Sequence, residues 1–300
     1  LRKEGRQMAD ICMGMLVNTR KPGALAMARF LMDWGKAHGV CFTLPPHEAS
    51  VLGIQGVDDD EWRKTVSVAI VIGGDGTFLR AARYVMGAPV SLYGINLGHL
   101  GFLASGKAEE AEKDMKSILA GEYTLQPHSV LEGEIYREEK SIHTLFALND
   151  LVLAKGAMAR VMHIEVGICG KILNTIPADG IIVSTPTGST AYALSAGGPI
   201  VPPHIPSMII IPICAHTLYS RPVLAGEKDV ITLTPKGYHR DLLLTQDGQL
   251  GYEILPGDSI RISLNSKMAV NVVNLPSRNY LDLLQEKLQW GKGIVTYERE

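Results

Sequence analysis

The chain has 300 residues, enough for two domains of ordinary size. Its 29 Lys and Arg residues against 31 Asp and Glu residues give a formal charge of −2, which argues against a general nucleic-acid binder, because such a protein needs a basic excess. Hydrophobic residues make up 46% and charged residues 20%, values of a globular protein that exclude a disordered chain.

Over the first 120 residues, runs typical of strands alternate with runs typical of helices. Residues 66–72 carry no polar side chain after Ser67, which indicates a strand buried on both faces, as in a parallel sheet covered by helices. The acidic run Asp58–Glu61 is expected to form a solvated loop or to begin a helix. In chain order the expected elements are strand 11–17, helix 22–39, strand 40–44, strand 66–72, helix 77–86, strand 91–95 and helix 108–120. This alternation predicts an open α/β domain.

After Gly121 the pattern changes to short strands separated by turn residues such as those at 235–237 and 256–258. We expect strands over 129–136, 144–153, 161–168, 171–174, 180–184, 207–213, 229–233, 241–245, 259–264 and 268–273. Many short strands with almost no helix indicate an antiparallel β-sandwich. The predicted domains are an α/β domain of residues 1–121, completed by the C-terminal segment 276–300 with its helix 280–288, and a β-sandwich-like domain of residues 122–275.

Residues 73–77, with the sequence GGDGT, lie between a predicted strand and a predicted helix. Glycines there let backbone N–H groups approach a phosphate, and the N-terminus of the helix favours an anion. The loop lacks the lysine of a Walker A motif. Asp75 would repel phosphate unless its carboxylate holds a metal ion or accepts a proton from a hydroxyl that attacks phosphorus. The alternative is a tight turn in which Asp75 caps a helix beginning at Gly76 or Thr77.

Two further glycine-rich segments follow. Residues 96–103, NLGHLGFL, come after the next strand and are expected to face the same sheet edge, where Asn96 binds ribose or phosphate or belongs to a turn. Residues 178–199, ADGIIVSTPTGSTAYALSAGGP, combine a strand, a hydroxyl-rich turn and a short helix. Their Tyr192 offers a ring for stacking a base. Hydroxyl donors for phosphate or ribose are Ser184, Thr185, Thr187, Ser189 and Thr190, with ordinary helix capping by Ser189 or Thr190 as the alternative.

Acidic residues interrupt the apolar pattern at two more places. Asn149 and Asp150 break the predicted strand 144–153; because a buried carboxylate is costly unless paired, they suggest a clamp on a ribose diol. The run 247–249, Asp-Gly-Gln, is interpreted as a hairpin turn. The cysteines form no CxxC pair, and we expect free, buried thiols in a reducing cytoplasm at Cys12, Cys41, Cys169 and Cys214.

Taken together, these segments resemble the NAD kinase family, whose members phosphorylate the 2′-hydroxyl of the adenosine ribose of NAD. The matching stretches, in the family's order, are GGDGTFLRAAR at 73–83, NLGHLGFL at 96–103, ND at 149–150, ADGIIVSTPTGSTAYALSAGGPI at 178–200, HTLYSRP at 216–222 and DGQ at 247–249. The resemblance implies a cytoplasmic homodimer or homotetramer with an α/β domain and a β-sandwich-like domain. It also implies ATP with a divalent cation, Mg²⁺, as phosphoryl donor, polyphosphate being a donor that some members accept, and no nucleic-acid or membrane partner.

The resemblance also implies residue roles. Asp75 is expected to be the general base on the 2′-hydroxyl, in a loop with Gly74, Gly76 and Thr77. No metal ligand is assigned, since Mg²⁺ is expected on the ATP phosphates. Residues expected to contact NAD are Asn149, Asp150, Asp179, Thr187, Ser189, Thr190, Ala191, Tyr192 and Ser195. Two positions depart from the family: Asp150 stands where Glu is common, and His128 where many members have Arg.

Two other functions stay open from the sequence. The GGDG loop is shared with lipid and sphingoid kinases, which need an apolar cleft for their substrates. A non-catalytic NAD(P)-binding regulator would bind NADP without producing any from NAD and ATP.

Overall fold

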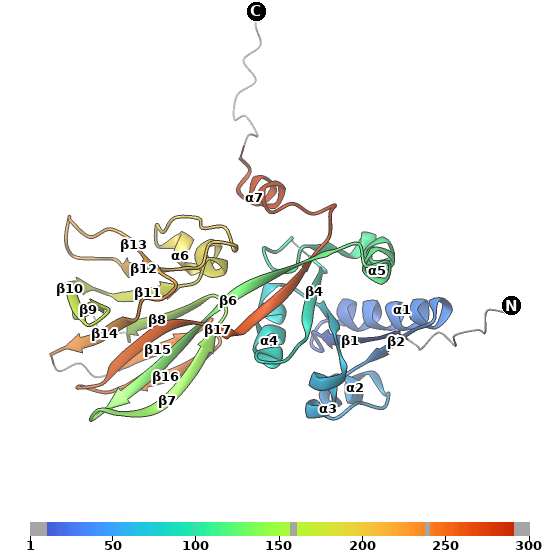
Figure 1. The fold of residues 1–300 in the computed structure, drawn as a ribbon, viewed down its shortest axis with the longest axis horizontal. Coiled ribbons are helices and arrows are strands. Elements are labelled where there is room, and N and C mark those ends of the chain that lie inside the picture. Colours follow the sequence, from blue (N-terminus) through green and yellow to red (C-terminus); the bar gives the residue numbers. More distant parts are fainter. Residues whose placement is uncertain (1–10, 99, 157–160, 238–240, 291–300) are drawn as a thin grey trace, which may run out of the picture. The chain divides into compact units, whose positions relative to one another are not determined.

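The computed structural model describes residues 11–98, 100–156, 161–237 and 241–290. The chain divides into two compact units, shown in Figure 1. The first contains the chain up to Ala81, residues Ala88–Leu125 and the chain from Asn271 on; the second contains Ala82–Gly87 and Gln126–Val270.

The first unit is built on a parallel sheet with the strand order β2-β1-β3-β4. Its strands are β1 (Ile11–Val17), β2 (Val40–Thr43), β3 (Val68–Ile72), β4 (Ser91–Asn96) and the short β5 (Gly106–Lys107) beside β4. Its helices are α1 (Pro22–His38), α2 (Pro46–Leu52), α3 (Asp59–Thr65), α4 (Asp75–Val85), α5 (Ala111–Leu119), which follows the 3-10 turn η1 (Ala108–Glu110), and α7 (Tyr280–Leu288). All five residues of β3 are buried, so the predicted α/β sheet is confirmed.

Local chemistry explains two helices of the first unit: one that the sequence offered as an alternative to a loop, and one that was not predicted. The carboxylate of Asp58 accepts hydrogen bonds from the N–H groups of Asp60 and Glu61, so the acidic run begins helix α3 instead of forming a loop. Helix α2 was not predicted. Pro46 occupies the first turn of α2, where a missing N–H costs nothing.

The second unit is a β-sandwich, as the fold prediction stated. One sheet has the antiparallel order β13-β12-β11-β8-β15-β16. The other contains β10-β9-β14-β17 together with β6 and β7. The core between them is made of buried aliphatic side chains from both sheets, among them Leu131, Leu151, Ile181 and Ile260. The strands are β6 (Thr124–Arg137), β7 (Lys140–Ala147), β8 (Asp150–Lys155), β9 (Met162–Ile168), β10 (Lys171–Ala178), β11 (Gly180–Ser184), β12 (Ser207–Ile213), β13 (Val223–Gly226), β14 (Ile231–Lys236), β15 (Leu242–Gln246), β16 (Leu250–Ile254) and β17 (Ser259–Asn274). A 3-10 turn, η2 (Thr187–Thr190), and the short helix α6 (Tyr192–Ser195) follow β11.

Several predicted strand limits are wrong. The predicted strand 144–153 is two strands, β7 and β8, separated at Leu148 and Asn149. The predicted strands 259–264 and 268–273 are the single strand β17, and β13 and β16 were not predicted. Pro235, interpreted as a turn residue, lies inside β14, which pairs with β17 only as far as Leu233; a proline fits where one side of a strand is unpaired.

The four cysteines form no disulfide, and all four are exposed, so the expectation of buried thiols is wrong. Cys169 and Cys214 lie just beyond the ends of β9 and β12, at positive φ angles of 49° and 47°, where the chain leaves the covered part of a sheet. Among the described residues, no helix is both long and apolar enough to cross a membrane.

Candidate functional site

The GGDGT loop connects the carboxyl end of β3 to α4, which begins at Asp75 itself. Asp75 accepts hydrogen bonds from a distant segment: Oδ2 from the N–H of Phe102 at 2.8 Å, and Oδ1 from those of Leu103 and Ala104, both at 3.1 Å. The carboxylate thus pins the end of the second glycine-rich segment. The alternative interpretation, in which Asp75 caps its own helix, is not what these hydrogen bonds show.

Among the described residues, the hydrogen bonds of Asp75 leave its carboxylate one acceptor site. A carboxylate offers about four lone-pair positions, two on each oxygen. Oδ1 uses both for backbone N–H groups, and Oδ2 uses one. The remaining position on Oδ2 is therefore where a proton or a hydroxyl donor can be received.

Gly101 explains why the second segment needs glycine. A Cβ at Gly101 would lie 1.9 Å from Oδ1 of Asp75, a distance at which something must shift. A Cβ at Gly98 would meet no atom closer than Oδ1 of Asn96, at 3.9 Å. Asn96 itself is nearly buried, and its Oδ1 accepts a hydrogen bond from the Gly98 N–H at 3.0 Å, in keeping with the turn that was its alternative role.

This contrast gives a paired prediction. Gly101→Ala is expected to displace the Asp75 carboxylate and to lower kcat by about 100-fold, since a misplacement of about 1 Å costs that much. Gly98→Ala is expected to leave kcat within about twofold, because its Cβ has room. Steady-state kinetics of the two purified variants compares them, and equal kcat values would contradict the assignment.

In the second unit, Asp247 anchors the junction between β7 and β8. Its Oδ1 accepts from the N–H groups of Asn149 at 2.7 Å and Asp150 at 3.2 Å, and its Oδ2 from that of Leu148 at 3.2 Å. The hairpin between β15 and β16 that contains Asp247 is confirmed, but its carboxylate also has this second task. Asn149 Oδ1 is buried and has no partner among the described residues, which leaves an acceptor open to a ligand.

Asp150 lies next to this anchor and is 5% exposed. Burial, and then the charge of Asp247, raise the pKa of Asp150 to about 7. Burial also raises the pKa of Asp247, against three backbone N–H bonds that lower it. The two carboxyl groups thus hold a proton at a pH where exposed aspartates are ionised.

A pH dependence of stability follows. The folded protein keeps the Asp150 proton to about pH 7, whereas the unfolded chain releases it near pH 4, so stability falls as pH rises through this window and levels off above it. Between pH 5 and pH 8, Asp150→Asn is expected to remove up to roughly 3 kcal/mol of this fall, because about two pH units of the window lie in that range, at about 1.4 kcal/mol each. Urea unfolding at pH 5 and pH 8 measures it, and an unchanged difference between the two pH values would argue against the raised pKa.

The hydroxyl-rich loop after β11 uses most of its hydroxyl groups internally. Ser184 and Thr185 are fully buried and donate to the backbone carbonyls of Asn149 and Leu148, at 3.1 and 2.6 Å. Ser189 is also fully buried; its Oγ donates to the Pro186 carbonyl at 2.6 Å. These three hydroxyl groups are therefore not the ligand donors that the sequence suggested. Ser189 and Thr190 do not cap α6 either, because Ala191 is its N-cap.

Close packing joins this loop to the β7–β8 junction. A Cβ at Gly188 would lie 2.1 Å from the backbone oxygen of Asn149. Thr187 Oγ1 lies 2.9 Å from Nδ1 of His128, whose pKa burial lowers to about 4, so this imidazole is neutral and supplies no positive charge. Asn149, Asp150 and the loop 184–190 thus form one neighbourhood.

The other predicted NAD residues have more open surroundings. Thr190 donates to the Thr187 carbonyl at 3.2 Å and is half-buried, as is Ala191. Tyr192 is 46% exposed and Ser195 is exposed. Asp179 lies 2.6 Å from Lys155 Nζ, and hydrogen bonding to that lysine lowers the pKa of its carboxyl. The sequence drew no attention to Lys155, because a lone lysine at a strand end carries no pattern.

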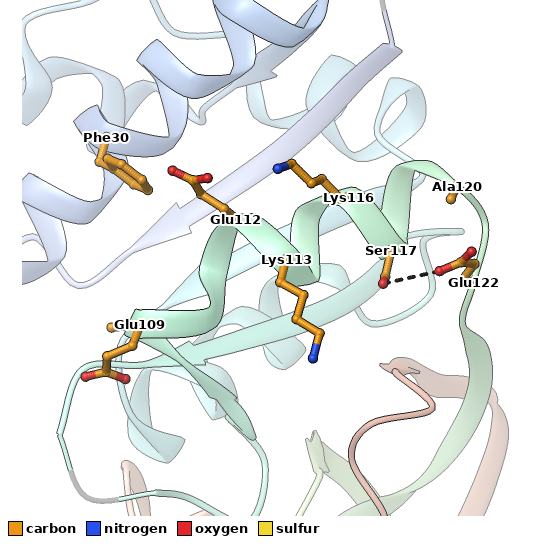
Figure 2. A pocket seen from close by; sticks show the side chains of 9 residues that line it. Phe30, Glu109, Glu112, Lys113, Lys116, Ser117, Ala120 and Glu122 are labelled. Carbon is orange, nitrogen blue, oxygen red and sulfur yellow. Dashed lines mark hydrogen bonds between the residues drawn. The ribbon is translucent and has the colours of Figure 1, made fainter.

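A separate hollow of about 630 Å³ lies in the first unit, between α1 and the segment of η1 and α5. Figure 2 shows its charged side chains, which carry both signs: Glu109, Glu112, Lys113, Lys116 and Glu122. None of the predicted site residues lines it. Across the described part of the chain, no group of three or more His, Cys, Asp or Glu side chains is placed to hold a metal ion.

A carboxylate anchored in a glycine loop at the end of a parallel strand, in a chain that continues into a β-sandwich, is an arrangement suited to a phosphotransferase, a two-domain kinase. The model of the ATP-NAD kinase N-terminal domain matches residues 54–123, and that of the ATP-NAD kinase C-terminal domain matches residues 148–275. The chain belongs to the ATP-NAD kinase family, as the resemblance predicted.

Relatives that match nearly the whole chain are NAD kinases as well. An NAD kinase from Moorella thermoacetica is 39% identical over 93% of this chain and 89% of its own length. One from Natranaerobius thermophilus is 36% identical over 94% and 99%. The fold is similar to that of yeast NADH kinase complexed with NADH, with a TM-score of 0.86, 22% identity and coverage of 97% of this chain and 91% of the other. It is also similar to an NAD kinase from Archaeoglobus fulgidus in complex with ATP, with a TM-score of 0.69, 22% identity and coverage of 93% and 98%.

Proposed function

We propose that the protein is an NAD kinase, which transfers the terminal phosphoryl group of ATP to the 2′-hydroxyl of the adenosine ribose of NAD, giving NADP and ADP. The observation that carries this proposal is the Asp75 carboxylate, held by three backbone N–H groups with one acceptor position left on Oδ2. The family match supplies the substrates.

In the proposed reaction, Asp75 accepts the proton of the 2′-hydroxyl as its oxygen bonds to the γ-phosphorus, and the bond from that phosphorus to the bridging oxygen of ADP breaks. The three N–H donors keep the carboxylate aimed while the proton moves. The start of α4, with Gly74, Gly76 and Thr77, is proposed to face the phosphates of ATP.

Mg²⁺ bound to the ATP phosphates would neutralise charge that builds up on the transferred group. Phosphate oxygens and water are donors that suit this cation, whereas no cluster of protein ligands in the described residues would hold it alone.

The second unit is proposed to bind NAD. The open acceptor Asn149 Oδ1 and the protonated Asp150 suit a ribose diol, whose hydroxyl groups both donate and accept. Asp179, Thr187, Thr190, Ala191, Tyr192 and Ser195 are proposed to complete this binding surface, and Ser189 to hold its loop in shape. On this proposal residues 1–121 and 276–300 serve ATP, and residues 122–275 serve NAD.

A homodimer or homotetramer in the cytoplasm is also proposed. Large apolar side chains at the surface of the second unit support it: Ile172 and Leu173 on β10, a strand at the end of its sheet order, are 67% and 51% exposed. Leu218 and Tyr219 in the HTLYSRP segment are 86% and 91% exposed. Size-exclusion chromatography with light scattering tests the assembly.

An assay for NADP formation tests the function. The purified protein is incubated with NAD, Mg²⁺ and either ATP, another nucleoside triphosphate or polyphosphate, and NADP is measured with an NADP-specific dehydrogenase. NADH in place of NAD tests the reduced substrate. Absence of NADP with every donor, together with tight NADP binding, would favour the regulator; phosphorylation of a sphingoid base instead would favour the lipid kinase.

A further inference from the structure

The segment that holds Asp75 is itself held from its other side. Phe102, Leu103 and Ala104 turn their N–H groups to the carboxylate of Asp75. The next carbonyl, that of Ser105, accepts a hydrogen bond from Nη1 of Arg278 at 2.8 Å. Arg278 lies 173 positions further along the chain, between the end of β17 and the start of α7.

Arg278 is fixed by two acidic partners, of which Asp114 is buried and the Glu110 side chain is 47% exposed. Its Nη2 lies 2.8 Å from Oδ2 of Asp114 and 2.8 Å from Oε2 of Glu110. The Asp114 carboxylate, which is 1% exposed, also accepts a hydrogen bond from Tyr93 Oη at 2.5 Å. Side-chain exposure of Arg278 is 12%. Only a guanidinium can donate from two nitrogens to a carbonyl and two carboxylates in this fixed geometry.

Helix α7 makes two more contacts with the same segment. Lys287 Nζ lies 5.5 Å from the centre of the Phe102 ring. Glu286 lies 3.7 Å from Nζ of Lys107, a partly exposed pair of small energetic weight. The C-terminal segment thus contacts residues 102, 105 and 107, whereas the N–H groups of residues 102–104 serve Asp75.

We propose that Arg278 is a positioning residue for phosphoryl transfer: by holding the Ser105 carbonyl, it fixes the three N–H groups that aim the Asp75 carboxylate. The proposal rests on the proposed function for its kinetic consequence. The C-terminal segment is then part of the catalytic apparatus, although none of its residues touches a reacting atom.

The test compares Arg278→Met, Arg278→Lys and a matched control, Arg137→Met. Arg137 forms a two-pronged ion pair with the fully buried Asp258, at 2.8 Å for each hydrogen bond, in the second unit. Arg278→Met is expected to lower kcat by about 30-fold, with KM for NAD and ATP within about threefold. Arg278→Lys is expected to recover part of the lost kcat, because lysine keeps the positive charge but cannot donate from two nitrogens as the guanidinium does. Arg137→Met is expected to lower Tm similarly and leave kcat within about twofold.

Amide hydrogen exchange supplies a readout that needs no activity. Residues 102–104 are expected to exchange at least about tenfold faster in Arg278→Met, and at the wild-type rate in Arg137→Met. Unchanged exchange there, or equal kcat in the two methionine variants, would overturn the proposal. If the wild-type protein forms no NADP, the proposed function fails, and the exchange result alone decides whether Arg278 holds this segment.

Discussion

Asp75→Asn is expected to abolish nearly all NADP formation, lowering kcat by about 1,000-fold or more. An amide cannot accept the proton of the 2′-hydroxyl, and general base catalysis alone contributes about 10²–10⁴-fold. A further loss arises because an amide nitrogen at the Oδ2 position would face the Phe102 N–H, donor against donor.

The measurement must separate lost chemistry from lost folding. Tm and the Kd for NAD are recorded for Asp75→Asn, and we expect the Kd to stay within about threefold while Tm falls modestly, since one hydrogen bond of about 1–3 kcal/mol is lost. Asp75→Glu is the companion variant: it keeps a base but moves it by one methylene, so low residual activity above that of Asp75→Asn is expected. Wild-type turnover in Asp75→Asn would show that Asp75 only anchors residues 102–104.

The second large effect is expected at Asp247. Asp247→Ala removes the acceptor of three N–H groups, two of which belong to the buried residues Leu148 and Asp150. Unsatisfied buried donors cost about 1–3 kcal/mol each, and alanine is also disfavoured at the φ of 49° found here. Relief of the repulsion with Asp150 offsets part of this cost. We expect a net loss of about 2–4 kcal/mol of stability and a KM for NAD raised at least about tenfold.

Two further variants serve as comparisons for Asp247→Ala. Asp247→Asn keeps the left-handed backbone accessible and one oxygen for Asn149 and Asp150, so it should lie between the wild type and alanine. Asp229→Ala removes another turn carboxylate, which accepts from the Gly226 N–H at a half-exposed position, and should cost about 1 kcal/mol without changing KM. Urea unfolding and steady-state kinetics measure both properties. An unchanged KM for NAD in Asp247→Ala would contradict the anchoring role.

The fold could be predicted from local patterns to a considerable extent. The apolar run before the GGDGT loop predicted strand β3, all five residues of which are buried. Strands β11 and β12 and helix α7 have the predicted limits. Errors arose where the pairing of a strand with distant strands decides its limits. Whether residues 259–274 form one strand or two depends on neighbours elsewhere in the chain, as does the tolerance of Pro235 in β14.

The site could be predicted less well, because its contacts are distant in sequence. Residue types identified Asp75 as a site residue and Asp247 only as part of a hairpin turn, and the N–H partners of these carboxylates lie 27–29 and 97–99 positions away. The hydroxyl groups of Ser184, Thr185 and Ser189 looked like ligand donors; the structure buries them against backbone carbonyls. A sequence pattern shows that a hydroxyl is present, not whether it faces a ligand.

The sequence by itself determined the order of an α/β unit and a β-sandwich, the glycine-rich loops and the family, because hydrophobic periodicity, turn chemistry and motif spacing are local properties. Only the tertiary structure decided that backbone N–H groups of residues 102–104 hold Asp75, that Asp150 is buried beside Asp247, and that Arg278 reaches Ser105. The physical reason is that hydrogen-bond satisfaction and desolvation depend on which distant groups the fold brings within about 3 Å of one another.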